Sequence, residues 1–366
     1  MRVTPTGMVA VYRQTVPRLE FCCMERFSKK AMLKRLPLPS AHDVARVAGV
    51  SQAAVSRAFN PGTSISETTR AKVLKAANEL GYRPNLLARS LITGRSGIIG
   101  VVIGNPRNPF FLDALDALSE RLSQAGLHLL VFTARADTNS DRLVAALLKF
   151  RVDSLLLMSA TLSSELAEQC KAEGIPVIFF NRRARMIEGF ASVTGANHFG
   201  AGRVAEHLVA QGYRKLAFIA GVENSSTSQE REAGFVSKIV SLGLPMPEKA
   251  FGNYDRPGGF AAARHLLALK PRPDAIFCAN DMMALATIEI ARHEFGLKIG
   301  RELGVAGFDD IEGACWPSFS LTTYSQPIEA MIEKVTEIIL NPTGFLDAPH
   351  IVVEGELKIR ESTLRA

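Results

Sequence analysis

From residue 98 onward the chain alternates between short apolar runs and longer amphipathic segments, and this alternation constrains the fold more than any other feature. The apolar runs cover residues 98–103, 127–132, 154–158, 177–180, 216–219, 275–278 and 304–306. The amphipathic segments cover residues 109–124, 140–150, 163–172, 200–210, 229–241, 258–269 and 282–292. Strands joined through helices pair in parallel, and the helices cover both faces of the sheet. Because twisted sheets rarely exceed about ten strands, we predict an α/β body with two parallel sheets of about five or six strands each.

A purely helical pattern precedes this alternation. Ser40, Ser51 and Ser66 each stand before a segment with apolar residues at helical spacing, where N-cap residues occur. Gly49 separates the first two segments and Gly81 follows the third, where a helix commonly ends in a left-handed residue. Three short helices with a glycine turn between the first two are typical of a helix-turn-helix unit, although a helical bundle without that function has the same spacing.

Charge divides the chain at the same place. Residues 1–96 hold 16 Lys and Arg against 5 Asp and Glu, whereas residues 97–366 hold 27 against 31. A basic N-terminal part on a mildly acidic body indicates that the helical unit contacts phosphate groups. Residues 1–38 lack sustained periodicity, and we expect a disordered or loosely attached extension there.

No catalytic, metal or membrane signature is found in the sequence. It has no GxSxG, P-loop or HExxH motif, and no GxGxxG at a strand–helix turn. Its five cysteines show no CxxC spacing, which favours reduced thiols, and we expect no metal and no cofactor. No apolar run is long enough to span a membrane and we find no secretory signal, so we expect a cytoplasmic protein without membrane contact. Asp309 and Asp310 end a predicted strand, where carboxylates more often bind ligand hydroxyl groups than catalyse, and we do not expect an enzyme.

Several short motifs together carry a family resemblance. In the helical unit they are residues 43–57 (DVARVAGVSQAAVSR), 65–70 (ISETTR), 80–85 (LGYRPN) and 88–91 (ARSL). In the body they are 108–111 (NPFF), 231–235 (REAGF), 280–281 (ND), 307–310 (GFDD) and 321–323 (LTT). In this order the motifs resemble the lactose-repressor (LacI/GalR) family of bacterial transcriptional regulators over residues 40–361. The resemblance implies a homodimeric repressor that binds a near-palindromic operator and responds to a small-molecule effector, such as a sugar, a sugar acid or a related metabolite.

The family binds DNA through the second helix of its head, which lies in the major groove. The resemblance therefore implies that Gln52, Ala53 and Arg57 face base edges, and Arg57 can form two hydrogen bonds to a guanine. It also implies phosphate contacts from Ser51, Ser56, Ser66, Thr69, Tyr82 and Asn85. A hinge helix with Ala88 and Leu91 would enter the minor groove, where Leu91 would wedge between base pairs.

The body resembles the periplasmic sugar-binding fold, which implies two lobes with the effector between them. The expected effector contacts are Phe110, Arg182, Asn197, Arg231, Tyr254, Asn280 and Asp309. Phe110 and Tyr254 would offer flat faces to a ring, and Arg231 would offer a two-pronged donor.

Charge in the expected cleft indicates the ligand class. Family members often carry Asp where this chain has Ala196, so one anion is missing while Arg231 is kept. Arg182, Arg183 and Arg185 end a predicted strand at the same cleft, although solvated surface arginines give the same pattern. We therefore expect an effector that combines hydroxyl groups with an acid group.

These inferences give a domain plan. We expect the extension at 1–38, a helix-turn-helix DNA-binding domain at 39–84, a hinge helix and linker at 85–96, and an effector-binding and dimerisation domain at 97–366. Chain crossings near Thr194, Ser325 and Pro349 would divide the last domain into a first lobe (about 97–194 and 326–348) and a second lobe (about 195–325 and 349–366). A solute-binding protein for transport would lack the head, and an enzyme with an appended DNA-binding region would need catalytic residues, so a regulator is favoured.

Overall fold

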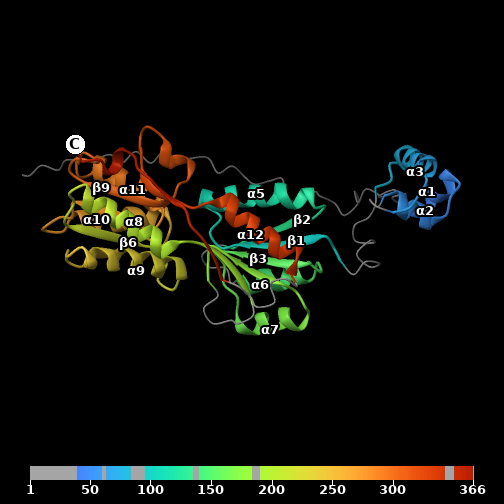
Figure 1. Ribbon diagram of the computed structural model, residues 1–366, viewed down its shortest axis with the longest axis horizontal. Helices are drawn as coiled ribbons and strands as arrows, with labels where there is room; N and C mark the ends of the chain where they lie inside the picture. The colour runs from blue at the N-terminus through green and yellow to red at the C-terminus, as the bar shows by residue number, and fades with distance from the viewer. Residues whose placement is uncertain are drawn as a thin grey trace, which may run out of the picture. The chain divides into compact units, whose positions relative to one another are not determined.

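The computed structural model of the chain describes residues 39–59, 63–83, 95–134, 140–183, 190–342 and 350–365 (Figure 1). The chain forms two compact units that divide between Asn85 and Leu86. The first unit contains the helical head and the second is the α/β body. The predictions for the extension at 1–38, and for Asn85, Ala88 and Leu91, lie outside the described residues.

The head consists of three helices packed around a small apolar core. They are α1 (Ala41–Ala48), α2 (Gln52–Ala58) and α3 (Glu67–Leu80). Val44, Val55 and Val73 are buried, one from each helix, and they hold the helices together. The helical prediction for this region is confirmed.

Each helix of the head begins at the serine that the sequence predicted as its cap. The side chains of Ser40, Ser51 and Ser66 each accept a hydrogen bond from the backbone N–H three residues further on. At α1 the bond is returned, because Asp43 accepts from the Ser40 N–H at 3.0 Å. Gly49 has a φ of +66°, a left-handed conformation that turns the chain between α1 and α2 without the strain that a Cβ atom adds.

The first lobe of the body is built on a six-stranded parallel sheet with the order β11-β5-β4-β3-β1-β2. Its strands are β1 (Ile98–Ile103), β2 (His128–Thr133), β3 (Ser154–Met158), β4 (Val177–Phe180), β5 (Ala191–Gly195) and β11 (His350–Val353). Its helices are α5 (Pro109–Gln124), α6 (Ser140–Leu148), α7 (Ser164–Ala172) and α12 (Ile328–Leu340). One apolar cluster joins the sheet to α5 and α12 and another joins it to α6 and α7, so helices cover both faces.

The second lobe has a six-stranded sheet with the order β12-β10-β9-β8-β6-β7. Its strands are β6 (Leu216–Ala220), β7 (Glu248–Phe251), β8 (Ala275–Cys278), β9 (Gly304–Asp309), β10 (Thr322–Ser325) and β12 (Glu356–Lys358). Its helices are α8 (Asn197–Ala210), α9 (Ser226–Ser241), α10 (Arg256–Leu267) and α11 (Asp281–His293). Helix α8 packs on α9, and α10 packs on α11. The sheet is parallel except at β12, which runs antiparallel to β10.

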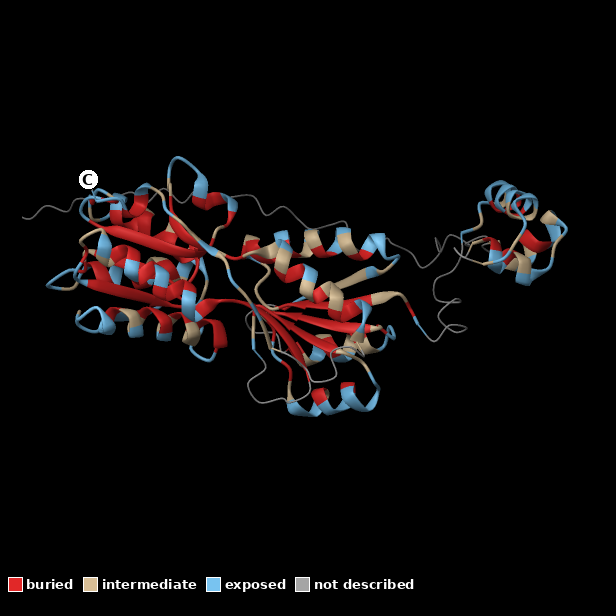
Figure 2. Ribbon diagram, viewed as in Figure 1, coloured by how far each residue is buried: buried red, intermediate tan, exposed pale blue. Residues whose placement is uncertain are grey.

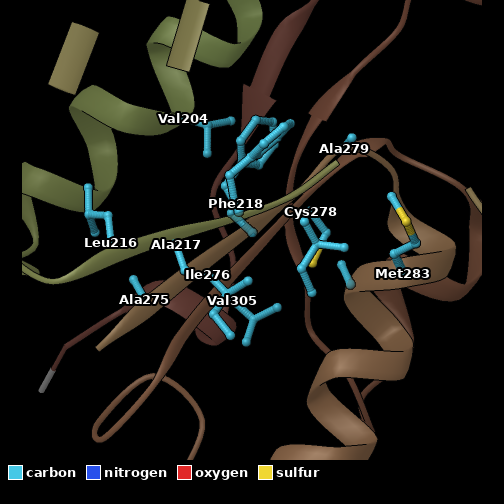
Figure 3. Packing of buried hydrophobic residues seen from close by; sticks show 14 of the residues in the cluster. Val204, Leu216, Ala217, Phe218, Ala275, Ile276, Cys278, Ala279, Met283 and Val305 are labelled. Atoms are coloured by element: carbon cyan, nitrogen blue, oxygen red, sulfur yellow. The ribbon is translucent and has the colours of Figure 1, made fainter. Parts of the chain in front are cut away.

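The buried residues of both lobes gather along their central strands (Figure 2). In the second lobe Phe218, Ile276 and Val305 come from three neighbouring strands and belong to one core cluster (Figure 3). None of the described helices combines the length and the apolar character needed to cross a bilayer.

Two parallel-rich sheets confirm the predicted fold class, and every predicted strand and helix of the body is present. Strands β5, β7, β10, β11 and β12 were not predicted. Strand β7 is an edge strand in which only Ala250 is buried, so it lacks an apolar run. Strand β10 has the sequence TTYS, whose polarity conceals that its first three residues are buried.

The predicted third crossing between the lobes is wrong in position. Strand β11 pairs in parallel with β5, so the chain stays in the first lobe through Val353 rather than leaving it near Pro349. It reaches the second lobe after Gly355. A Cβ atom at Gly355 would collide with the carbonyl oxygen of Ser325, so two of the crossing segments touch at this glycine.

Candidate DNA interface and effector site

Helix α2 presents one polar face to solvent and packs the other into the head. Val55 and Ala58 are buried against α1 and α3. The exposed residues include Ser51, Gln52, Ala53, Ser56 and Arg57. These are the residues of this helix and its cap that the sequence analysis assigned to base and phosphate contacts. The fold of the head therefore leaves the predicted DNA-reading face free.

Local bonds position the two ends of this face. The Ser51 hydroxyl accepts from the Ala54 N–H at 3.2 Å and fixes the start of α2. The Arg57 Nε atom donates to the Ala53 carbonyl oxygen at 3.3 Å, which holds the guanidinium along the helix. An arginine whose stem is held in this way can present its planar group to a base edge.

The other predicted phosphate contacts have structural roles as well. The Ser66 hydroxyl caps α3 by accepting from the Thr69 N–H and also hydrogen-bonds to the Thr69 hydroxyl at 2.8 Å. Tyr82 is half-buried, and its ring packs on Phe59 with the ring centres 5.8 Å apart. Its aromatic ring thus stabilises the head.

Asp309 is the centre of a hydrogen-bond network between the two lobes. It ends β9 with a φ of +123° and is buried. Its carboxylate accepts from Asn108 Nδ2 of the first lobe at 2.9 Å and from Gln326 Nε2 at 2.7 Å. Arg231 Nη1 of the second lobe lies 3.5 Å away. One carboxylate therefore ties α5, the segment after β10 and α9 to one another.

Arg231 is the largest polar side chain buried in this network, with only 2% of it exposed. Its Nε atom donates to Asn197 Oδ1 at 2.9 Å, and Nη1 donates to the Ala279 carbonyl oxygen at 2.5 Å. The guanidinium carbon lies 3.7 Å from the centre of the Phe308 ring. Nη2, the remaining nitrogen, has no partner among the described residues.

Two buried carboxyl groups have shifted pKa values. Burial raises the pKa of Asp309, and the charge of Arg231 opposes the shift. Burial also raises the pKa of Asp281 to about 7, and the neighbouring charge of Asp309 adds to the shift. Asp281 accepts from the Thr323 hydroxyl at 2.6 Å and from the Ile311 N–H at 3.0 Å. Asp281, at the start of α11, thus connects β10 to the segment that follows β9.

Tyr254 hydrogen-bonds to one other predicted residue, Asn280. Its hydroxyl hydrogen-bonds to the Thr227 hydroxyl at 3.0 Å, and its carbonyl oxygen accepts from Asn280 Nδ2 at 3.3 Å. Asn280 is fully buried and also caps α11, since its Oδ1 accepts from the Met283 N–H. Both ends of the Asn280 amide are therefore used within the protein.

Arg182 connects the first lobe to the second. Its guanidinium donates to the carbonyl oxygens of Ser159 and Asn224, each at 3.4 Å. The neighbouring Arg183 N–H donates to the Ser226 hydroxyl at 3.0 Å. Burial lowers the pKa of Arg182, and the nearby Tyr254 partly offsets this.

Phe110 lies in the core of the first lobe rather than at an open surface. Only 1% of it is exposed, with the Phe180 ring stacked at 6.0 Å and the edge of Phe111 at 5.2 Å. Phe110 therefore offers no free face to a ligand in this structure. Of the seven predicted effector residues, hydrogen bonds join Asn197, Arg231 and Asp309 into one group and Tyr254 and Asn280 into another.

Sequence reasoning missed two donors to Asp309, namely Asn108 and Gln326. Asn108 opens the NPFF motif and caps α5, accepting from the Phe110 N–H at 3.2 Å. Its second role was hidden because the partner lies 201 residues away. Gln326 directly follows β10 at a crossing between the lobes, a position where polar side chains meet the ligand in two-lobed folds.

A cavity of about 550 Å³ lies at the opposite end of the first sheet and is lined by none of the predicted effector residues. Asp153, at its wall, accepts from the Ser96 N–H at 2.7 Å, the Ser96 hydroxyl at 3.0 Å and the Gly97 N–H at 2.9 Å. This side chain therefore anchors the segment through which the chain enters the body.

Two family models match the chain. The model described as "Bacterial regulatory proteins, lacI family" matches residues 40–85, which include the whole described head. The model described as "Periplasmic binding proteins and sugar binding domain of LacI family" matches residues 96–331, more than half of the chain.

Similar proteins match over most of their length. The HTH-type transcriptional regulator CelR of Thermobifida fusca is 30% identical over 340 residues, which cover 90% of this chain and 100% of CelR. The HTH-type transcriptional repressor PurR of Pectobacterium carotovorum subsp. carotovorum (strain PC1) is 30% identical over 304 residues, covering 82% and 89%. The crystal structure of the lac repressor dimer bound to operator and the anti-inducer ONPF matches with a TM-score of 0.79 at 27% identity, covering 89% of this chain and 99% of that one. A complex of the transcriptional regulator CelR with cellobiose matches with a TM-score of 0.67 at 28% identity, covering 88% and 99%.

Proposed function

Since this chain belongs to the lacI family of bacterial regulatory proteins and is therefore a DNA-binding transcriptional regulator rather than an enzyme, we propose that it represses transcription as a cytoplasmic homodimer. Two heads bind the two halves of a near-palindromic operator, as the symmetry of a dimer requires. An effector held between the lobes of the body controls the affinity for that operator.

The observation that carries this proposal is the free polar face of α2. Val55 and Ala58 anchor the helix, and the exposed side chains on the opposite side are Gln52, Ala53, Ser56 and Arg57. A recognition helix in the major groove needs this division between a buried and a reading face. Arg57 is the base reader that we expect to discriminate most strongly, with Gln52 and Ala53 beside it.

The effector site is the network around Arg231 and Asp309. Asn108 of the first lobe and Arg231 of the second lobe both bind Asp309, so a ligand that bonds to either partner alters the connection between the lobes. A change in the angle between the lobes of two dimerised bodies changes the spacing of their heads. We propose that operator affinity is controlled in this way.

The proposed domain plan follows the same logic. Residues 39–84 form the DNA-binding domain, and residues 85–96 form the hinge helix and linker, in which Ala88 and Leu91 enter the minor groove. Residues 97–366 bind the effector and form the dimer. Asn85 joins Ser66, Thr69 and Tyr82 as a phosphate contact.

Removal of the Arg57 guanidinium tests the DNA-binding role. We expect Arg57→Ala to lose about 1–3 kcal/mol of discrimination at one base pair in each half-site. Competition binding of the full chain against all four bases at each operator position measures this loss. Arg46→Ala removes the same charge from an exposed site on α1 and should change all sequences alike. Unchanged discrimination at every position in Arg57→Ala excludes Arg57 as a base reader.

A further inference from the structure

Four buried side-chain atoms lack a hydrogen-bond partner among the residues that the structure describes, and they gather where the lobes meet. They are Asn181 Oδ1, Thr194 Oγ1, Arg231 Nη2 and Gln326 Oε1. Asn181 directly follows β4, Thr194 lies near the end of β5, and Gln326 follows β10. Native proteins rarely leave buried polar atoms unpaired, so these atoms point to groups that a ligand supplies.

Close contacts join the four residues into one cluster. Gln326 donates to Asp309, which also contacts Arg231. The Gln326 amide oxygen lies against Gly195, the residue that follows Thr194. The Asn181 N–H donates to the Val193 carbonyl oxygen at 2.8 Å, one residue before Thr194. The four residues therefore belong to one connected group at the ends of these strands.

The kinds of unpaired atom define the ligand's polar groups. Arg231 Nη2 can only donate, so the ligand must place an acceptor opposite it. The amide oxygens of Asn181 and Gln326 can only accept, so they need donors such as hydroxyl groups. Gln326 cannot simply be turned round, because its Nε2 already donates to Asp309.

Two arginines, Arg231 and Arg182, and two carboxylates, Asp309 and Glu230, lie in this region. Asp309 is the one carboxylate that the structure places within ion-pair distance of Arg231, and Asn108 and Gln326 share it. Arg182 donates to two uncharged carbonyl oxygens, and no described carboxylate lies within ion-pair distance of it. Glu230 is nearby, and it accepts from Asn197 Nδ2 at 3.0 Å.

The N-terminus of α8 supplies positive potential at the same point. Helices α5, α7, α10 and α11 of the body each have a side-chain cap, whereas α8, α9 and α12 have none, and α8 begins at Ala196, whose side chain cannot supply one. The Ala196 side chain offers no acceptor to the first N–H groups of α8; Ala196 and Asn197 are buried there, whereas His198 and Phe199 are exposed. Arg231 Nε bonds to Asn197, the first residue of α8, which brings the unpaired Nη2 beside this helix end. An uncapped helix N-terminus next to a guanidinium suits an anion.

We propose that the effector is an acidic polyol whose carboxylate or phosphate group binds the N-terminus of α8 beside Arg231, and whose hydroxyl groups bind Asn181, Thr194 and Gln326. The inference rests on the proposed effector-controlled function and specifies the ligand class of that site. Ala196 is the specificity-determining position, because a side-chain acceptor there would occupy the place of the ligand's acid group.

Ala196→Asp separates the proposed role from a purely structural one. The new carboxylate caps α8 and should raise the unfolding temperature of the ligand-free chain. The same carboxylate repels the acid group, so binding of an acidic ligand should weaken by about tenfold or more, since hydrogen bonds to charged groups are among the strongest. Arg203→Gln removes a charge from an exposed position on the same helix and should leave ligand preference unchanged.

Thermal unfolding and calorimetric titration of the full chain measure both effects. The probes are D-glucuronate against D-glucose, D-galacturonate against D-galactose, D-glucose 6-phosphate against D-glucose, and inorganic phosphate alone. We expect saturable stabilisation by at least one acid, none by its neutral counterpart, and loss of the effect in Ala196→Asp. The carboxylate and phosphate arms show which anion the site accepts.

Three results overturn the proposal. In the first, an acid and its neutral counterpart bind equally well. In the second, Ala196→Asp binds the acid as tightly as the wild type does. In the third, neither phosphate nor any of the acids stabilises the protein in a saturable way. Selection of DNA fragments by the same protein distinguishes these failures from failure of the proposed function. If specific DNA is still selected, only the ligand assignment is wrong.

Discussion

Asn108 combines two roles that substitution can separate. Its Oδ1 caps α5 by accepting from the Phe110 N–H, and its Nδ2 donates to Asp309 in the other lobe. Asn108→Ser keeps a cap but removes the donor to Asp309. Asn108→Asp also keeps a cap, but it places a second carboxylate against the first.

The expected magnitudes follow from burial and charge. Asn108 is buried, and a hydrogen bond to a charged group contributes about 1.5–3 kcal/mol. Asn108→Ser should therefore lower the unfolding temperature of the body by roughly 3–12 °C, because about 1 kcal/mol corresponds to 2–4 °C in a domain of this size. Asn108→Asp should lower it further, because two buried carboxylates then repel each other.

The defect of Asn108→Asp should depend on pH. Burial already raises the pKa of Asp309, and a second carboxylate raises it more, above its value in the unfolded chain. When the pKa is higher in the folded chain than in the unfolded chain, folding favours the protonated carboxyl group. Stability therefore falls as pH rises from the unfolded-state pKa to the folded-state pKa. The gap between Asn108→Asp and Asn108→Ser should thus widen from acidic to neutral pH.

Thermal unfolding followed by circular dichroism, over a pH series with the full chain, measures these differences. Equal stability of the wild type and Asn108→Ser would show that the bond to Asp309 contributes nothing. A gap between the two variants that narrows as pH rises would refute the electrostatic reasoning.

Two further predictions concern the head and the linker. Hydrogen bonds from Ser40 hold the pKa of Asp43 at about 2, below its ordinary 3.8. The capping contact therefore stabilises α1 at pH values above 3.8, and this stabilisation is lost as pH falls through about 2. Amide hydrogen exchange of α1 in the full chain should show this acid dependence, and Asp43→Asn should remove it. Asp153→Ala removes the acceptor for three hydrogen bonds from Ser96 and Gly97. It should weaken operator binding, or the response of operator binding to effector, while effector affinity stays the same. Anisotropy titrations with operator and calorimetric titrations with effector measure the two affinities, and reduced effector affinity would place Asp153 in a different role.

Local patterns gave the fold because they depend on neighbouring residues. The predicted caps at Ser40, Ser51 and Ser66 are confirmed. They could be predicted because each cap bonds to a backbone N–H only three residues further along the chain. Strand β11 was missed, and the third crossing misplaced with it, because a short edge strand near the end of the chain is defined by its pairing with β5 rather than by its own sequence.

The candidate site was less predictable because its contacts span the chain. Arg231 and Asp309 were identified, but Asn108 and Gln326 were not. Both are common surface residue types, and the partner of Asn108 lies 201 residues away along the chain. Phe110 was assigned to the ligand by its position in the family resemblance, whereas packing against Phe180 and Phe111 buries it in the core. Burial of this kind is decided by tertiary packing.

Footprinting on DNA selected by the full chain tests the central claim most directly. If two heads of a dimer bind through α2, the selected sequences should contain two inverted half-sites with centres about 10 base pairs, or a multiple of that, apart. Protection should cover both half-sites together and should change when an effector is added. Selection of no specific sequence, or protection of a single half-site without symmetry, would contradict the account.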